Sequence, residues 1–191
     1  ILPSLYLGTI EYYRNIIQSE QVEIEKCEYF KKQTLRNRCY IHGANGVLPL
    51  VVPVVHSKIE KNLMKDVRVC YASNWQKIHW KSIESAYRSS SWFEFYEEAF
   101  YPFYHKKIEF LFDFNEGVRE AIFGILDIKQ TVTHTQTYTD KIANISDFRN
   151  NFDRYHSEIS PLPYPQVFES RNGFIPNLSI IDLIFNMGND A

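Results

Sequence analysis

Apolar and polar positions follow two different periods along the chain. Residues 22–25 alternate apolar and acidic side chains, which predicts a half-buried strand. Residues 10–18 place apolar side chains three to four positions apart, which predicts a helix with Thr9 as its N-cap. By the same criteria, further strands are expected at the start of the chain, at 66–72, at 131–138 and at 164–168, and further helices at 73–90, 91–104 (stopping near Pro102), 107–127 and 179–187.

The clearest turn signal lies between two β-rich runs. Asn45-Gly46 separates these runs, and this dipeptide is the strongest short sequence signal for a β-hairpin. Pro49 and Pro53 have no backbone N–H, which predicts a sheet edge or a bulge for the second strand. Mixed strands and helices predict an α/β or α+β fold, with a single mixed sheet, a β-hairpin and packed helices in one domain over residues 1–191.

Composition and charge narrow the class of protein. A chain of 191 residues with 45% hydrophobic residues can bury its own core, and a net charge of −2 argues against a nucleic-acid partner. No run of about 18 apolar residues occurs, so no membrane span is expected. Three cysteines without a CxxC motif predict reduced thiols and a cytoplasmic location. The chain begins with isoleucine rather than methionine, which is compatible with a missing N-terminal piece, and the oligomeric state stays open.

Positive charge is concentrated in residues 31–38, which contain two lysines and two arginines. Arg36 and Arg38 are two positions apart, so on a strand they point to the same face. Two guanidinium groups on one face can bind a phosphate or a carboxylate in a bidentate manner. Glu25 and Glu28 lie just upstream and could pair with the arginines instead. The spacing therefore fits either an anion site or an ion-paired strand edge.

A histidine and a serine–aspartate pair are the other candidates for chemistry. His79 shares a helix face with Trp75 and Ile83, which suits either a general base or a part-buried structural histidine. Ser179 precedes Asp182 by three positions, the spacing of a helix capping box, which would explain both residues without any chemistry.

Several familiar motifs are missing from the sequence. It contains no P-loop, GxGxxG, GxSxG or HExxH, and its six histidines show no metal-ligand spacing with the cysteines. We therefore predict no metal and no cofactor. A nucleophilic role for Cys39 beside the arginines is conceivable, although a buried structural thiol is the simpler interpretation.

Four stretches, taken in order, resemble the WbqC-like protein family. They are LPSLYLGTIEYY, YFKKQTLRNRCYIHGANGVLPLVVPV, IHWKSIESAYRSSSWFEFY and YPQVFESRNGFIPNLSIIDLIFNMG. The strongest parts are the Lys-x-x-x-x-Asn-Arg stretch before the hairpin, the His-Trp helix and the closing Pro-x-Leu-Ser-Ile-x-Asp-Leu segment. Four motifs in order are far more specific than any one of them.

The resemblance implies a cytoplasmic enzyme of bacterial surface-polysaccharide synthesis, of the O-antigen type, that transfers an acyl or aminoacyl group to a sugar or sugar-nucleotide. Its expected ligand is a small phosphorylated or carboxylated molecule. The alternative is a non-catalytic binding or assembly protein that works with a partner enzyme. Polar residues inside the shared motifs are the candidates: His79 and Asp182 as catalytic residues, and Lys32, Arg36, Asn37, Arg38, Lys81, Gln166, Ser179 and Asn186 as substrate-binding residues.

Overall fold

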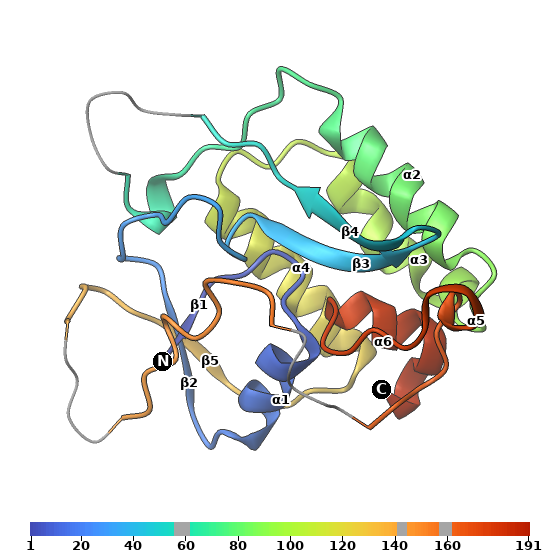
Figure 1. The fold of residues 1–191 in the computed structure, drawn as a ribbon. Helices are drawn as coiled ribbons and strands as arrows, with labels where there is room; N and C mark the ends of the chain where they lie inside the picture. Colours follow the sequence, from blue (N-terminus) through green and yellow to red (C-terminus); the bar gives the residue numbers. More distant parts are fainter. Residues whose placement is uncertain (56–61, 141–144, 157–161) are drawn as a thin grey trace.

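The strands in the described part of the chain form two separate sheets (Figure 1). The computed structural model describes residues 1–55, 62–140, 145–156 and 162–191. A parallel sheet contains β1 (Leu2–Pro3), β2 (Val22–Glu25) and β5 (Val132–His134), with β2 in the middle. An antiparallel hairpin contains β3 (Arg38–Gly43) and β4 (Gly46–Val51). The predicted α/β class with a hairpin and packed helices is confirmed, with the strands in two sheets rather than one.

The edge of β3 that faces away from β4 explains why the hairpin does not join the parallel sheet. The backbone N–H of Ser179 donates a hydrogen bond to the carbonyl oxygen of Tyr40 on β3, at 2.9 Å. Helices α2 and α6 also pack against β3. The segment that leads into α6 therefore takes the place that a strand of the other sheet would need.

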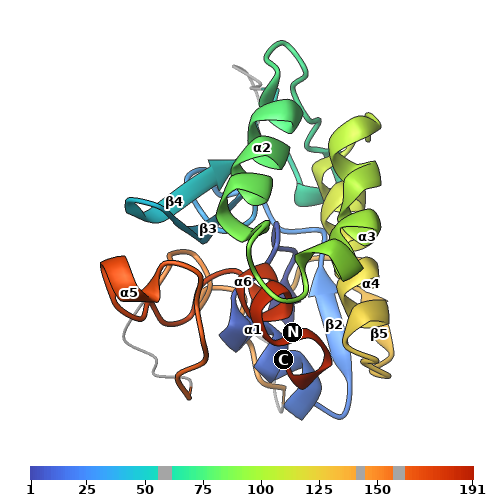
Figure 2. The same ribbon diagram turned by 90° about the vertical axis from the view of Figure 1, so that its right-hand side faces the viewer.

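Six α-helices in the described part of the chain surround the strands (Figures 1 and 2). Figure 2 shows α2 between the hairpin and α3, with α4 behind α3. The aromatic core gathers around Phe185 of α6, whose ring centroid lies 5.1 to 5.5 Å from those of Tyr87, Phe93 and Phe100. The helices are α1 (Ile10–Gln18), α2 (Trp75–Tyr87), α3 (Phe93–His105), α4 (Leu111–Ile125), α5 (Glu169–Asn172) and α6 (Ile180–Met187), with 3₁₀ turns η1 (Met64–Asp66) and η2 (Gly188–Asp190).

The predicted helix N-cap at Thr9 and the predicted hairpin turn at Asn45-Gly46 are both confirmed. The hydroxyl of Thr9 accepts the Tyr12 N–H at the start of α1, at 3.4 Å, as expected of an N-cap. Gly46 closes the hairpin opposite Gly43 with φ +99°. Helix α3 continues beyond Pro102 to His105, although the missing N–H of Pro102 removes one hydrogen bond from the helix.

Two predicted strands are wrong. Residues 66–72 make only isolated bridges, such as Val54 with Val69, because Pro53 next to this bridge cannot donate to extend a ladder. Residues 164–168 form no strand, since Tyr164 and Gln166 turn inward to a buried carboxylate and no other described strand lies beside their backbone. Within the described residues, no helix combines the length and the apolar character needed to cross a membrane.

Gly188 at the end of α6 provides a test of this architecture. Its φ is +63°, and a Cβ atom built on it would lie 2.5 Å from the Trp92 ring. We expect Gly188→Ala to lower the free energy of unfolding by more than about 1 kcal/mol, through backbone strain and the clash. Urea denaturation measures this change.

Gly124 of α4 is the matched control. A Cβ atom at this position meets nothing within 4 Å, and the backbone has no positive φ. Gly124→Ala should stabilise the protein by up to about 1 kcal/mol because alanine favours a helix. Two changes of the same sign would contradict this account.

Candidate functional site

A basic pocket of about 580 Å³ lies between the segment before the hairpin and residues 153–155. Its volume is in the range of small-molecule sites. The charged side chains that line it are four basic and one acidic, and two tyrosines complete the wall. These residues are Lys31, Lys32, Arg38, Arg154, Asp153, Tyr40 and Tyr155. The pocket thus brings together two of the predicted substrate-binding residues, Lys32 and Arg38.

A tight turn places the lysines at the pocket. Gln33 adopts a left-handed conformation with φ +61°. The Thr34 hydroxyl then donates to the carbonyl of Lys31 at 2.8 Å, and the backbone N–H of Asn37 donates to the carbonyl of Thr34 at 3.4 Å. The turn leaves Lys32 exposed while Arg36, four residues later, is buried.

Arg36 lies beneath the pocket rather than in its lining. It precedes β3, so it does not share a strand face with Arg38 as predicted from the spacing. Its guanidinium is fully buried and donates to both carboxylate oxygens of Glu28, at 2.7 and 2.9 Å, and to Asp153 at 2.6 Å. Burial acts to lower the pKa of Arg36, but Glu28 and Asp153 outweigh it and raise the pKa. Arg36 is therefore a permanent cation that ties the two walls together.

A second buried arginine, Arg149, holds the loop that carries Asp153 in place. Arg149 donates to Glu25, at the end of β2, at 3.1 Å and to Asp147 at 2.6 Å. The backbone carbonyl of Arg149 in turn accepts a hydrogen bond from Arg36 at 2.9 Å. The loop that carries Asp153 is thus fixed to β2 by the buried ion pair of Arg149 with Glu25, while the pair with Asp147 lies within the loop itself.

Three cations of the pocket have no counter-ion in the described part of the chain. Lys31 pairs with Asp153 at 3.3 Å, whereas Lys32, Arg38 and Arg154 make no ion pair there. The Nε atom of Arg38 is also buried without a hydrogen-bond partner among the described residues. Unpaired cations that converge on one hollow suit a phosphate or a carboxylate.

Two tyrosine rings, tilted against each other, form an aromatic wall of the pocket. The ring centroids of Tyr40 and Tyr155 are 5.0 Å apart with planes inclined by 31°. The Tyr155 hydroxyl donates to the carbonyl of Pro176 at 2.7 Å. Burial, together with the nearby charge of Asp182, raises the pKa of Tyr155 to about 12, so this hydroxyl keeps its proton at neutral pH. The wall can therefore offer ring surface without adding negative charge.

Asp182 is the centre of a buried polar cluster near the pocket. Its carboxylate accepts hydrogen bonds from the hydroxyls of Tyr87 at 2.7 Å and Tyr164 at 2.6 Å, and from the Gln166 amide at 2.8 Å. Burial raises the pKa of Asp182, and the three donors limit this rise. The carboxylate links α2, α6 and the segment at 164–166.

The predicted capping box is wrong. The Ser179 hydroxyl makes no capping hydrogen bond and donates instead to the carbonyl of Leu7 at 2.8 Å. The carboxylate of Asp182 turns away from the helix start, toward the tyrosines. Asn186 stays within α6, where its amide donates to the Asp182 carbonyl at 2.7 Å.

The remaining predicted residues lie away from the basic pocket. His79 is buried in the core, where its Nδ1 atom lies 3.0 Å from the Tyr6 hydroxyl. Asn37 is buried and donates to the carbonyl of Val52 at 2.8 Å. Lys81 is exposed on α2 and lines a separate hollow of about 340 Å³ near the tip of the hairpin. The structure therefore does not bring the ten predicted residues together at one site, and the catalytic roles of His79 and Asp182 stay predictions.

Sequence reasoning missed half of the pocket. Arg154 and Tyr155 fall in residues 139–163, which look like a polar loop without strand or helix period. The only available signal was the Asp153-Arg154-Tyr155 run, in which charged and aromatic side chains are adjacent. Tyr40 lies in a correctly predicted strand, but the ring that it packs against, that of Tyr155, is 115 positions away.

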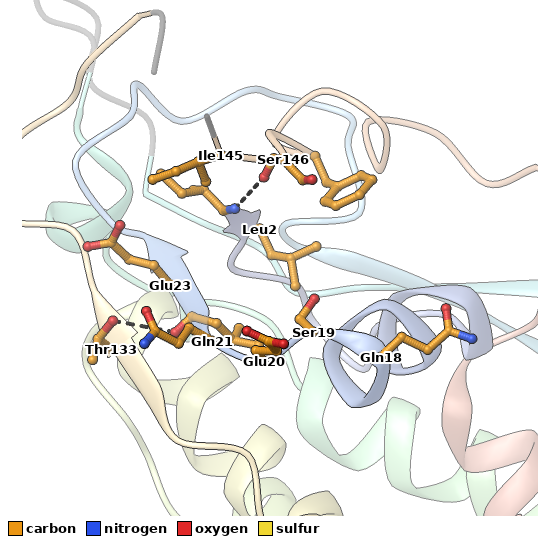
Figure 3. Close-up of a pocket in the computed structure, with 12 residues that line it drawn as sticks. Leu2, Gln18, Ser19, Glu20, Gln21, Glu23, Thr133, Ile145 and Ser146 are labelled. Atoms are coloured by element: carbon orange, nitrogen blue, oxygen red, sulfur yellow. Dashed lines mark hydrogen bonds between the residues drawn. The ribbon is translucent and has the colours of Figure 1, made fainter. Parts of the chain in front are cut away.

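A larger hollow of about 670 Å³ has the opposite character (Figure 3). Glu20 and Glu23 line it together with amide and hydroxyl side chains, and no lysine or arginine is among the lining residues. It contains none of the predicted site residues. Across the described ranges, no group of three or more His, Cys, Asp or Glu residues is arranged to hold a metal ion.

The chain belongs to the WbqC-like protein family, which matches residues 4–157. It is also similar to the uncharacterized protein Rv1507c of Mycobacterium tuberculosis (strain ATCC 25618 / H37Rv), with 24% identity over 226 residues, which cover 100% of this chain and 94% of that protein. No solved structure matches the chain. Neither match names a reaction or a substrate.

The buried guanidinium predicts a large loss of stability when it is removed. Arg36→Met leaves the buried Glu28 carboxylate unpaired, which should cost about 3–5 kcal/mol in urea denaturation. Arg68→Met is the control, because Arg68 and Glu109 form an exposed pair that contributes about 1 kcal/mol or less. Adding Glu28→Gln to Arg36→Met should restore part of the loss. Equal effects of the two arginine variants would contradict the structural role of Arg36.

His79 predicts a specific dependence of stability on pH. Burial lowers the pKa of His79 to about 4, whereas the unfolded chain has a pKa of about 6.5. The unfolded state therefore binds the proton first, and stability should fall by about 3 kcal/mol as the pH drops from 6.5 to 4. His79→Asn should remove this part of the slope, and the exposed His105→Asn should keep it. Urea midpoints between pH 7.5 and 4.5 test this, and parallel slopes for wild type and His79→Asn would refute it.

Proposed function

We propose that the basic pocket binds the phosphate or carboxylate of a sugar-nucleotide type of ligand, and that the protein is a cytoplasmic transferase of bacterial surface-polysaccharide synthesis. The observation that carries the proposal is the convergence of Lys32, Arg38 and Arg154, unpaired in the described structure, beside a tyrosine wall. The resemblance described above supplies the polysaccharide context and the class of reaction, transfer of an acyl or aminoacyl group.

Charge and shape support an anionic small molecule over a large polyanion. The pocket carries a local excess of positive charge, although the chain as a whole has a net charge of −2. Asp153 is part of the lining, but Arg36 and Lys31 already neutralise its carboxylate. An entering anion would therefore meet free donors on one side and ring surface on the other.

Within this proposal, binding is the part that the geometry supports best. His79 and Asp182 keep the catalytic roles predicted from the sequence, with His79 as the base, yet neither lines the basic pocket. A test of these roles asks whether His79→Asn and Asp182→Asn abolish transfer while affinity for pyrophosphate, which has no ring, is retained. Both variants remaining fully active would exclude the catalytic assignments.

The alternative, a non-catalytic binding or assembly protein, is favoured by one feature of the surface. Several large apolar side chains are exposed, including Phe95 at 72% on α3 and Ile78 at 60% on α2. A protein that works only with a partner could cover such side chains. Formation of a transfer product by the purified protein alone would rule this alternative out.

Ligand affinity tests the proposed pocket directly. We expect Lys32→Ala and Arg38→Gln each to weaken binding of UDP-glucose and of pyrophosphate by about tenfold or more, since each removes a charge-assisted hydrogen bond worth about 1.5–3 kcal/mol. Lys77→Ala, an exposed lysine of α2 outside the pocket, should bind as the wild type does. Isothermal titration calorimetry measures these affinities. Loss of affinity in all three variants, or in none, would refute the pocket as the anion site.

A further inference from the structure

We infer that the ligand of the basic pocket carries a flat ring that packs on the tyrosine wall, and that Gln166 is the positioning residue that holds this wall in place. The inference rests on the proposed anion site. Gln166 is buried and does not line the pocket, so it acts through other residues. Its contacts form a continuous path from Asp182 to Tyr155.

The amide of Gln166 clamps the backbone of Ile175 on both sides. The backbone N–H of Ile175 donates to Gln166 Oε1, and Gln166 Nε2 donates to the Ile175 carbonyl, each at 2.9 Å. The same Nε2 group lies 2.8 Å from a carboxylate oxygen of Asp182. Because Asp182 is itself held by two tyrosine hydroxyls, the clamp is anchored to α6 and cannot rotate freely.

Pro176 transmits this constraint to the wall of the pocket. Its carbonyl accepts the hydrogen bond of the Tyr155 hydroxyl at 2.7 Å. The next residue, Asn177, adds a second tie, since its amide donates to the carbonyl of His156 at 3.0 Å. Residues 155 and 156 are thereby fixed to the segment that Gln166 clamps, and the Tyr155 ring is held against Tyr40.

An oriented pair of rings is more than an anion requires. Phosphate and carboxylate recognition needs donors, which Lys32, Arg38 and Arg154 supply. A tyrosine hydroxyl that is already bonded to Pro176 uses its proton there, so Tyr155 offers the pocket mainly its ring. Ring surface at a fixed angle favours a flat partner such as a nucleobase or another aromatic group.

Phenyl phosphate and methyl phosphate test the inference, because both present the same phosphate and only one carries a ring. Titration calorimetry on the intact protein should show a preference for phenyl phosphate of about threefold to tenfold, the range expected of a ring contact. Gln166→Met should abolish this preference and leave methyl phosphate binding unchanged. Tyr155→Leu should do the same, and the double variant should lose nothing further.

Gln76 provides the matched control. Its amide also donates to backbone carbonyls, those of Phe103 and Lys106, at a distance from the pocket. Gln76→Met should therefore lower stability without changing the ring preference. Tyr155→Phe tests the path even if Gln166→Met does not fold, because it keeps the ring and removes the bond to Pro176; the preference should fall.

The outcomes separate the two proposals. Failure of both phosphates to bind the wild type would refute the anion site itself. Equal binding of the two by the wild type would overturn the inferred ring while leaving the anion site intact. A ring preference that persists in Gln166→Met, or in Tyr155→Phe, would overturn the positioning role of Gln166.

Discussion

A buried positive charge on Arg36 is the constraint on which the described site depends. Burying a guanidinium costs free energy unless its N–H groups have hydrogen-bond partners and its charge is paired. The guanidinium of Arg36 pairs with the carboxylates of Glu28 and Asp153. These two residues come from segments far apart in the chain. The ion pairs of Arg36 therefore hold the segment before β3 and the segment at 153–155 together. Because Glu28 and Asp153 pair with Arg36, they do not neutralise the other basic side chains of the pocket.

Asp182 plays the complementary part as a buried negative group. Its carboxylate accepts hydrogen bonds from hydroxyl and amide groups of α2 and of the segment at 164–166. Arg36, by contrast, donates to carboxylates. One polar centre supports the basic side of the pocket, and the other supports its aromatic side. Aromatic packing around Phe185 supplies bulk stability, but apolar contacts are tolerant of shifts. Directional bonds at the two buried charges define which side chains meet.

The sequence is sufficient for features encoded locally and insufficient for those created by distant contacts. The Asn45-Gly46 turn and the amphipathic helices were predictable because backbone preference and periodicity act over a few residues. The capping-box interpretation of Asp182 failed because its partners lie in distant segments. Spacing could not decide between an anion site and an ion pair for Arg36 and Arg38, since Asp153, which pairs with Arg36, is more than 110 positions away. The resemblance to the WbqC-like family pointed to ten polar residues without showing which of them meet.

The proline in β4 has a consequence for how the protein behaves in a crowded solution. Pro49 sits opposite Tyr40, in the middle of a strand that has no described neighbour strand on its outer side. An open strand edge with apolar side chains such as Val47 and Val51 is ordinarily a template for growth into fibrils. Because the imide nitrogen has no hydrogen to donate, a further strand could not form an unbroken ladder there. The hairpin can thus remain uncovered without recruiting misfolded copies.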